Sequence, residues 1–220
     1  MKMKGCTIIA NGRAPKKTDV TYFQSLGYKT TICADGGANT AYRLGLDPAL
    51  IIGDFDSIDP AVLEYFSTRC KLVRYARQND TDVEKCIKYA IRTHHEKAVI
   101  LGATGDRLDH SICNLGILLK YRDQINVSMM HECSYLQVLK GRTTLEAVEG
   151  ETISIYGFDS KTKIQSAGLK YPLKNVALPF GVRESTSNIA LSSKVELKLS
   201  GGKVFVVRDY KLLRSHGLIS

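Results

Sequence analysis

Apolar and polar positions alternate in a regular rhythm over about the first 130 residues of the chain. Short apolar runs are separated by stretches in which apolar residues recur with helical periodicity. The apolar runs predict strands at residues 6–10, 30–34, 50–53, 71–75, 98–102 and 125–130. Strands that alternate with helices in this way are typical of an open, mostly parallel sheet.

Helical periodicity is clearest at residues 82–94, where one face carries the apolar residues Val83, Cys86, Ile87, Ala90 and Ile91. Thr81 and Glu84 form a capping-box pattern at its start. A second helix is predicted at residues 108–121, with a common stripe of Ile112, Leu115 and Leu119. A third is predicted after Gly36-Gly37, with one side formed by Ala38, Ala41 and Tyr42. The predicted fold class of this part is therefore α/β, with a Rossmann-like open sheet.

The pattern changes after about residue 135. Residues 152–156, 195–199 and 204–207 are rich in β-forming side chains, and turn dipeptides such as Gly201-Gly202 separate such runs. No long helical period follows. The sequence therefore predicts two domains, an α/β domain at residues 1–134 and an all-β sandwich at residues 135–220.

Composition narrows the class of ligand. The chain has 31 Lys and Arg against 22 Asp and Glu, a formal net charge of +9. This excess favours polyanionic ligands such as nucleotides, but it is spread along the chain without a basic run, which argues against a dedicated nucleic-acid module. No apolar stretch reaches the roughly 18 residues of a membrane span. The cysteines form no CxxC pair, which favours reduced thiols in a cytoplasmic protein.

Polar clusters follow several of the predicted strands, and ligands bind beyond the carboxyl ends of strands in open α/β sheets. Asp35, Gly36, Gly37 and Asn39 follow the second predicted strand, where glycines allow close approach of a phosphate and Asp35 can accept hydrogen bonds from a nucleoside. The alternative is a plain strand–turn–helix corner.

Asp54 and Asp56 follow the third strand in the segment IIGDFDSI. In an extended backbone both carboxylates would project to one side and repel unless a cation such as Mg²⁺ lies between them. Asp82, next to the cap residue Thr81, is a third metal ligand on this hypothesis. The alternatives are a solvated acidic loop and ordinary charge stabilisation of a helix start.

A last cluster follows the fifth strand. Gly102 opens a flexible segment, and Arg107 and Asp109 begin the next helix. Arg107 is suited to bind phosphate and to stabilise charge on a transferred group, and Asp109 to orient a hydroxyl or take its proton. The alternative for both residues is helix capping and surface pairing.

Together the segments ADGGAN, IIGDFDSI, NDTDVEKC and GATGDRLDHSICNL closely resemble the motifs of thiamine pyrophosphokinases, in the same order and with similar spacing. The C-terminal segments GLKY and STSN agree, so the resemblance covers nearly the whole chain. It implies an α/β nucleotide-binding catalytic domain, a thiamine-binding β-sandwich, and a homodimer with active sites at the subunit interface. Asp106 stands where many members have a small residue, and Tyr171 where some have Trp.

The resemblance also implies site residues. Metal and catalytic carboxylates are expected at Asp54, Asp56 and Asp82, and further catalytic groups at Arg107 and Asp109. Nucleotide contacts are expected at Asp35, Gly36, Gly37, Asn39, Thr81, Gly102 and Arg107. Thiamine contacts are expected at Tyr171, Ser185, Ser187 and Asn188. Tyr171 can stack on the ligand rings or face the thiazolium charge, although a core aromatic is the alternative.

The implied reaction is transfer of the pyrophosphoryl group of Mg-ATP to the thiamine hydroxyl, which yields thiamine diphosphate and AMP. Thiamine and ATP are then the small-molecule partners, with no nucleic acid and no membrane. The chain has no GxxxxGK[ST] segment, so Mg²⁺, glycines and Arg107 would have to hold the phosphates. Two rivals are a phosphatase that uses Asp54 as nucleophile and a basic nucleic-acid-binding module.

Overall fold

The structure is a computed structural model that describes residues 3–75, 80–105 and 107–219. The chain divides into two compact units, Met1–His131 and Glu132–Ser220. With strands and helices combined in this way, the protein is of mixed α/β class.

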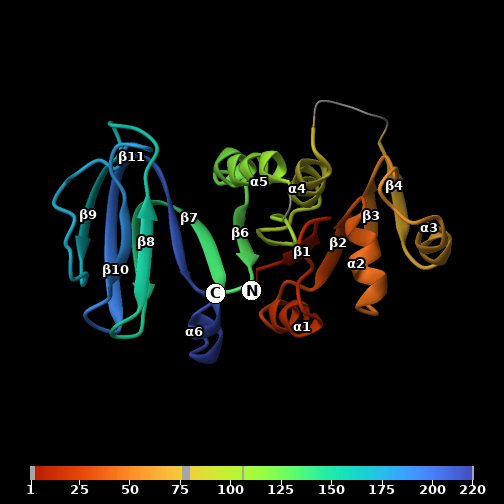
Figure 1. Cartoon of the computed structure of the whole chain (residues 1–220), viewed down its shortest axis with the longest axis horizontal. Helices are drawn as coiled ribbons and strands as arrows, with labels where there is room; N and C mark the ends of the chain where they lie inside the picture. Colours follow the sequence, from red (N-terminus) through yellow and green to blue (C-terminus); the bar gives the residue numbers. More distant parts are fainter. Residues whose placement is uncertain (1–2, 76–79, 106, 220) are drawn as a thin grey trace. The chain divides into compact units, whose positions relative to one another are not determined.

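The first unit contains a parallel sheet (Figure 1). Its strands are β1 (Gly5–Ile9), β2 (Thr30–Ala34), β3 (Leu50–Gly53), β4 (Lys71–Arg74), β5 (Lys97–Leu101) and β6 (Asn126–His131). Their spatial order is β6-β5-β1-β2-β3-β4. Because β1 pairs with both β2 and β5, the strand order reverses on either side of β1, and such reversals open a ligand crevice at the carboxyl ends of strands.

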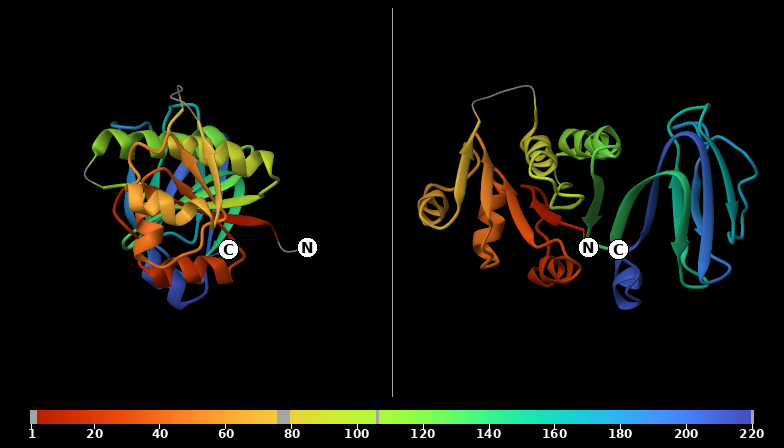
Figure 2. Two further views of the ribbon diagram at one scale, coloured as in Figure 1. Left: turned by 90° about the vertical axis from the view of Figure 1, so that its right-hand side faces the viewer. Right: turned by 180° about the vertical axis from the view of Figure 1, so that it is seen from behind.

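Helices connect these strands in chain order. They are α1 (Lys17–Ser25), α2 (Gly37–Arg43), α3 (Pro60–Ser67), α4 (Asp82–Arg92) and α5 (Leu108–Tyr121). Helices α4 and α5 lie on one side of the strands and α1 lies on the other (Figure 2). The central strands β1, β2, β3 and β5 are almost entirely buried, as expected for strands covered on both faces, and Ile8, Ile32 and Ile52 have no exposed surface. Strand β4, at the edge of the sheet, is partly exposed.

In its described residues, 132–219, the second unit consists of antiparallel strands and one short helix. These are β7 (Ser134–Glu146), β8 (Thr152–Tyr156), β9 (Lys163–Ala167), β10 (Ser185–Ile189), β11 (Lys194–Asp209) and α6 (Tyr210–Ser215). Strand β11 pairs with β7, β8 and β9, and β10 pairs with β8. Residues such as Ile153, Ile164 and Val206 form a common apolar core.

The separation of residues 195–199 and 204–207 into two strands was wrong, because both belong to β11. The pairing of β11 with β7 shifts register between Lys198 and Lys203, around Gly201 with a φ of 106°. A shift of this kind bends a strand without ending it, whereas the Gly-Gly pair by itself is typical of a turn.

The helix predicted at residues 108–121 is confirmed, but its buried face is not the predicted one. Ile112 is 62% exposed, and the buried residues are Asn114, Ile117, Leu118 and Tyr121. The amide Nδ2 of Asn114 donates to the Ala103 carbonyl at 2.7 Å, which turns this face inward. A polar side chain fixes the rotation of the helix here, so apolar periodicity alone gave the wrong stripe.

Smaller differences concern two other helices. Tyr42 does not share the buried side of α2 with Ala38 and Ala41, because it is half exposed and packs its ring edge-on against Tyr65. The cap of α4 is confirmed, since Thr81 Oγ1 accepts a hydrogen bond from the Glu84 N–H at 3.3 Å. In the described part of the chain, no helix is long and apolar enough to cross a membrane.

Candidate active site

A cavity of about 820 Å³ lies at the carboxyl ends of the first unit's strands. Loops after β1, β2 and β5 contribute to its wall, as do the first turn of α4 and the first half of α5. The described lining includes Asn11, Gly12, Arg13, Asp35, Thr81, Asp82, Gly102, Thr104, Arg107, His110, Asn114 and His131. Ser57, from the segment that carries Asp54 and Asp56, also lines the cavity, so four of the polar clusters in the sequence contribute residues to it, although Asp54 and Asp56 are not themselves in the described lining.

Asp35 organises the loop that follows β3. Its side chain is buried, and one carboxylate oxygen accepts the Phe55 N–H at 2.8 Å while the other accepts the Ser57 N–H at 3.1 Å. Gly53 makes this approach possible, because a Cβ there would lie 2.6 Å from Asp35 Oδ1. Burial, and secondarily the charge of Asp82, raise the pKa of Asp35.

Asp54 and Asp56 lie beside Asp35. One carboxylate oxygen from each of the three residues lies within 4.8 Å of the others, a spacing that suits a shared metal ion. The expectation of an extended backbone at Asp54 and Asp56 was wrong, because Phe55 adopts a left-handed φ of 69° and the loop turns there. The two N–H bonds to Asp35 hold that turn, so the carboxylates come together through a bend.

Asp82 faces the same cavity but is not a member of this group of three carboxylates. Its carboxylate accepts a hydrogen bond from Lys85 Nζ at 2.8 Å, and the Lys85 side chain is itself buried. Thr81, beside it, lines the cavity and caps α4. The structure thus brings the carboxylates of Asp54 and Asp56 together with that of Asp35. The carboxylate of Asp82 instead pairs with Lys85.

Arg107 and Asp109 form an exposed ion pair at the start of α5. Arg107 Nη2 donates to Asp109 Oδ2 at 2.5 Å, and Nε donates to Oδ1 at 3.2 Å. This contact lowers the pKa of Asp109 to about 2 and raises the pKa of Arg107. Asp109 therefore remains ionised and is a weak proton acceptor. Asp106, which precedes the pair, lies outside the described residues.

Gly36, Gly37 and Asn39 make close contacts with the segments that follow β1 and β3. A side chain at Gly36 would collide with the Asn11 side chain, and one at Gly37 with the Ile9 carbonyl. Asn39 Nδ2 donates to the Ser57 carbonyl at 3.0 Å, and Asn39 Oδ1 accepts the Asp59 N–H at 3.0 Å. Asn39 thereby holds the loop that follows β3, whereas Gly36 and Gly37 allow close approach to the end of β1 and to Asn11. Their role as nucleotide contacts remains a prediction.

In the second unit, Asn188 connects two of the predicted thiamine-binding segments. Its buried amide accepts the Tyr171 N–H at 3.0 Å and donates to the Tyr171 carbonyl at 2.7 Å and to Ser185 Oγ at 3.1 Å. The Tyr171 side chain is 59% exposed, so it is not the core aromatic of the alternative interpretation. Ser187 has a left-handed φ of 52°, and its N–H donates to Ser154 Oγ.

Sequence reasoning missed part of the cavity wall. Asn11, Gly12 and Arg13 line the cavity directly after β1, and His110 and His131 line it as well. The signal was available, because Asn-Gly-Arg follows a predicted strand as the recognised clusters do. His131 ends β6, where its Nδ1 hydrogen-bonds Thr104 Oγ1 at 2.5 Å.

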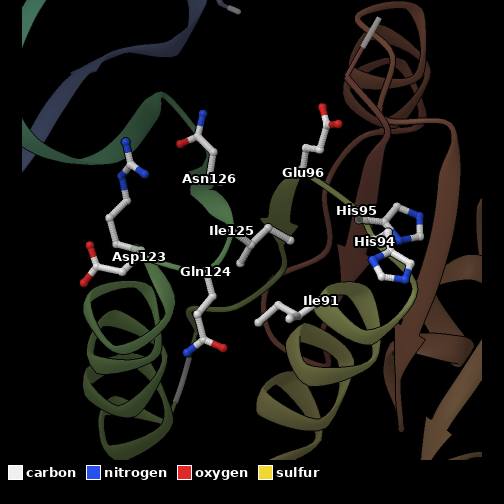
Figure 3. A pocket seen from close by; sticks show the side chains of 9 residues that line it. Ile91, His94, His95, Glu96, Asp123, Gln124, Ile125 and Asn126 are labelled. Carbon is white, nitrogen blue, oxygen red and sulfur yellow. The ribbon is translucent and has the colours of Figure 1, made fainter. Parts of the chain in front are cut away.

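A second cavity, of about 530 Å³, lies at the amino ends of β5 and β6, so it is at the opposite end of the strands from the first cavity (Figure 3). Its lining includes His94, His95, Glu96 and Gln124. His95 is buried and hydrogen-bonds Thr93 and Thr30 through its two ring nitrogens, and burial lowers its pKa. These contacts give His95 a packing role, remote from the carboxylates.

A mixed α/β sheet with clustered carboxylates and an arginine at the strand ends defines a class of protein suited to phosphorylated ligands. Two family models match the chain, "Thiamin pyrophosphokinase, catalytic domain" at residues 25–129 and "Thiamin pyrophosphokinase, vitamin B1 binding domain" at residues 141–204. The chain belongs to the thiamine pyrophosphokinase family, whose members are enzymes that transfer a pyrophosphoryl group from ATP to thiamine. The family predicted from the sequence motifs is thereby confirmed.

Individual relatives agree with this assignment. The chain is 31% identical to thiamine pyrophosphokinase 2 of Oryza sativa subsp. japonica, over 77% of this chain and 74% of that protein. It is 31% identical to thiamin pyrophosphokinase 1 of Caenorhabditis elegans, over 73% and 70% of the two chains. The crystal structure of thiamine pyrophosphokinase from Bacillus subtilis superposes with a TM-score of 0.79 at 25% identity, over 94% of this chain and 99% of that chain.

Proposed function

We propose that this chain transfers the pyrophosphoryl group of ATP to the hydroxyl of thiamine, giving thiamine diphosphate and AMP. The family match over both units carries the proposal, because it places this chain among enzymes of that reaction. The clustered carboxylates at the strand ends supply chemistry that fits it. Family membership favours this reaction over the phosphatase and nucleic-acid interpretations.

Mg²⁺ is the metal that we propose for this site. The three oxygens of Asp35, Asp54 and Asp56 fit a small divalent ion, since they are hard ligands gathered within 4.8 Å. When bound, Mg²⁺ would neutralise charge on the triphosphate. The sequence did not predict Asp35 as a metal ligand, and we add it to the proposed ligands. Asp82 would also be a ligand if its carboxylate bound the ion in place of Lys85.

The protein side chains would act mainly by positioning and by electrostatics. The thiamine hydroxyl oxygen attacks the β-phosphorus, the bond between that phosphorus and the bridging oxygen of the α-phosphate breaks, AMP leaves with this oxygen, and the hydroxyl proton is released to water. Arg107 stabilises negative charge on the transferred group. Asp109 orients the hydroxyl, since a carboxylate with a pKa of about 2 takes a proton poorly.

The remaining roles follow the two units. We propose a Rossmann-like nucleotide domain at residues 1–134 and a thiamine-binding β-sandwich at residues 135–220, with Tyr171, Ser185, Ser187 and Asn188 as the thiamine contacts. A homodimer is supported by exposed apolar side chains at Leu108, Ile112, Phe180 and Val182. A cytoplasmic location stays a prediction. The six free thiols are consistent with it.

The test is incubation with ATP, Mg²⁺ and thiamine, with AMP and thiamine diphosphate measured together. The two products should form in equal amounts. ADP with thiamine monophosphate would mean a different transfer, and phosphate release without thiamine would mean hydrolysis.

Asp54→Asn tests the carboxylate group. This change keeps the shape of the side chain but removes one charge from the three clustered carboxylates, so AMP formation should fall by roughly 100-fold or more. Asp47→Asn, a change of the same chemistry outside the cluster, is the matched control and should leave the rate unchanged. Near-normal turnover of Asp54→Asn would contradict its metal role.

A further inference from the structure

The lining of the cavity at the strand ends includes both carboxylates and guanidinium groups. Asp35 and Asp82 supply carboxylates from the ends of β2 and the start of α4. Among the described residues of the lining, the guanidinium groups are those of Arg13, after β1, and Arg107, before α5. A polyphosphate bound in this cavity needs positive charge close to its oxygens, and both arginines contribute to the lining.

The backbone at Arg13 is fixed by the neighbouring loop. The Gly12 N–H donates to the Gly102 carbonyl at 2.7 Å, and the Arg13 N–H donates to the Thr104 carbonyl at 2.7 Å. These bonds continue the pairing of β1 with β5 beyond the strand ends, into the crevice where the strand order reverses.

Gly12 allows the two loops to come this close. A Cβ on Gly12 would lie 2.5 Å from both the Gly102 and the Thr104 carbonyl oxygens. The second loop is held in turn by Asn114, which donates to the Ala103 carbonyl, and by the contact between Thr104 and His131. Arg13 therefore projects from a rigid support, and its side chain is exposed at the cavity.

We propose that Arg13 binds the polyphosphate chain of ATP, as a second arginine beside Arg107. The proposal rests on the proposed function for the identity of the nucleotide. A guanidinium presents a planar fork of N–H donors that matches phosphate oxygens, and such charge-assisted bonds are stronger than neutral ones. The loop at residues 11–13 is thus a phosphate-binding element that the chain has in place of a P-loop.

The experiment measures binding of ATP and of adenosine by calorimetry in Arg13→Gln. Affinity for ATP should fall about tenfold or more, because a charged hydrogen bond to phosphate is lost. Affinity for adenosine, which carries no phosphate, should not change. Arg13→Lys keeps the charge without the fork and should lose less affinity for ATP.

The control is Arg69→Gln, an exposed arginine after α3 whose guanidinium contacts Tyr65. It should bind ATP as the unaltered protein does. Thermal unfolding would verify that Arg13→Gln is folded. ATP affinity within twofold of the unaltered protein, or an equal loss of adenosine affinity, would overturn the proposal. If the unaltered protein binds ATP but makes no thiamine diphosphate, the proposed function fails, while the role of Arg13 is still decided by the binding data.

Discussion

At the scale of single residues, Asp35 connects structure and chemistry. Its two oxygens accept N–H groups from the loop that carries Asp54 and Asp56, and the same carboxylate belongs to the group suited to a cation. The cost of burial falls on its charged form, so its pKa is raised. The Asp35 carboxyl is therefore ionised less readily than an ordinary aspartate.

As the pH is lowered, binding of Mg²⁺ should therefore begin to weaken at a higher pH than it would if Asp35 had the pKa of an ordinary aspartate. A cation binds the ionised carboxylate, so its affinity is lost as pH falls through the raised pKa of Asp35, above the ordinary value of 3.8. Asp109 should not set this midpoint, because its pKa is about 2. Calorimetric titrations with Mg²⁺ across pH measure it.

Asp109→Asn is the control for this prediction and should give the same midpoint. Asp35→Asn should abolish the transition or move it to lower pH. A midpoint at or below 3.8 in the unaltered protein, or a shift caused by Asp109→Asn, would show that Asp35 is not the controlling group.

The sequence identified Asp54 and Asp56 because an acidic pair after an apolar run is a local pattern. It did not reveal that Asp35 joins them, because this depends on hydrogen bonds between residues about 20 positions apart and on the left-handed φ of Phe55. Arg13 was missed for a related reason. Its place in the cavity follows from the pairing of β1 with β5, which are distant in the chain.

At the scale of elements, α4 and α5 are tied together by one buried carboxylate. Glu84, in the first turn of α4, accepts a hydrogen bond from Tyr121 Oη and another from Lys120 Nζ, both at 2.5 Å. Burial and this contact raise the pKa of Tyr121. The contact therefore connects the first turn of α4, which begins at the cavity with Asp82, to the last turn of α5.

Tyr121→Phe should destabilise the protein by about 1–3 kcal/mol, because it removes a donor from a buried carboxylate. The aromatic ring and its packing are retained. Chemical denaturation would measure the change in the free energy of unfolding.

Tyr42→Phe is the matched control. That ring is half exposed on α2, so its free energy of unfolding should change by no more than about 0.5 kcal/mol. Equal effects of the two variants would mean that the contact of Tyr121 with Glu84 contributes nothing.

Periodicity located most elements but not every face. The strand at Leu50–Gly53 and the helix at Leu108–Tyr121 begin and end where the sequence predicted them. The buried stripe of α5 was wrong because Asn114 hydrogen-bonds Ala103, a tertiary contact that apolar periodicity does not contain. Strand β11 was divided because Gly201-Gly202 reads locally as a turn, whereas its pairing with β7 continues beyond it.

At the scale of the whole molecule, each unit has its own means of stability. The first depends on an apolar sheet with helices on both sides. The second has a smaller apolar core and, in addition, a buried ion pair. Arg208, on β11, donates to Glu151 through Nε at 2.6 Å and through Nη2 at 2.8 Å. The sequence did not predict this pair, because the two residues are 57 positions apart and no local pattern connects them.

Glu151→Ala should destabilise the second unit by about 3–5 kcal/mol, because the guanidinium of Arg208 would remain buried without its carboxylate. The control is Glu196→Ala on the exposed side of β11, where a surface change should cost no more than about 0.5 kcal/mol. Hydrogen exchange provides the measurement, since amides of β8 and β11 should lose protection in Glu151→Ala while those of β1 and β5 keep theirs. Loss of protection throughout β1 and β5 would instead mean that the two units unfold together, and unchanged protection in β8 would mean that the ion pair contributes little to stability.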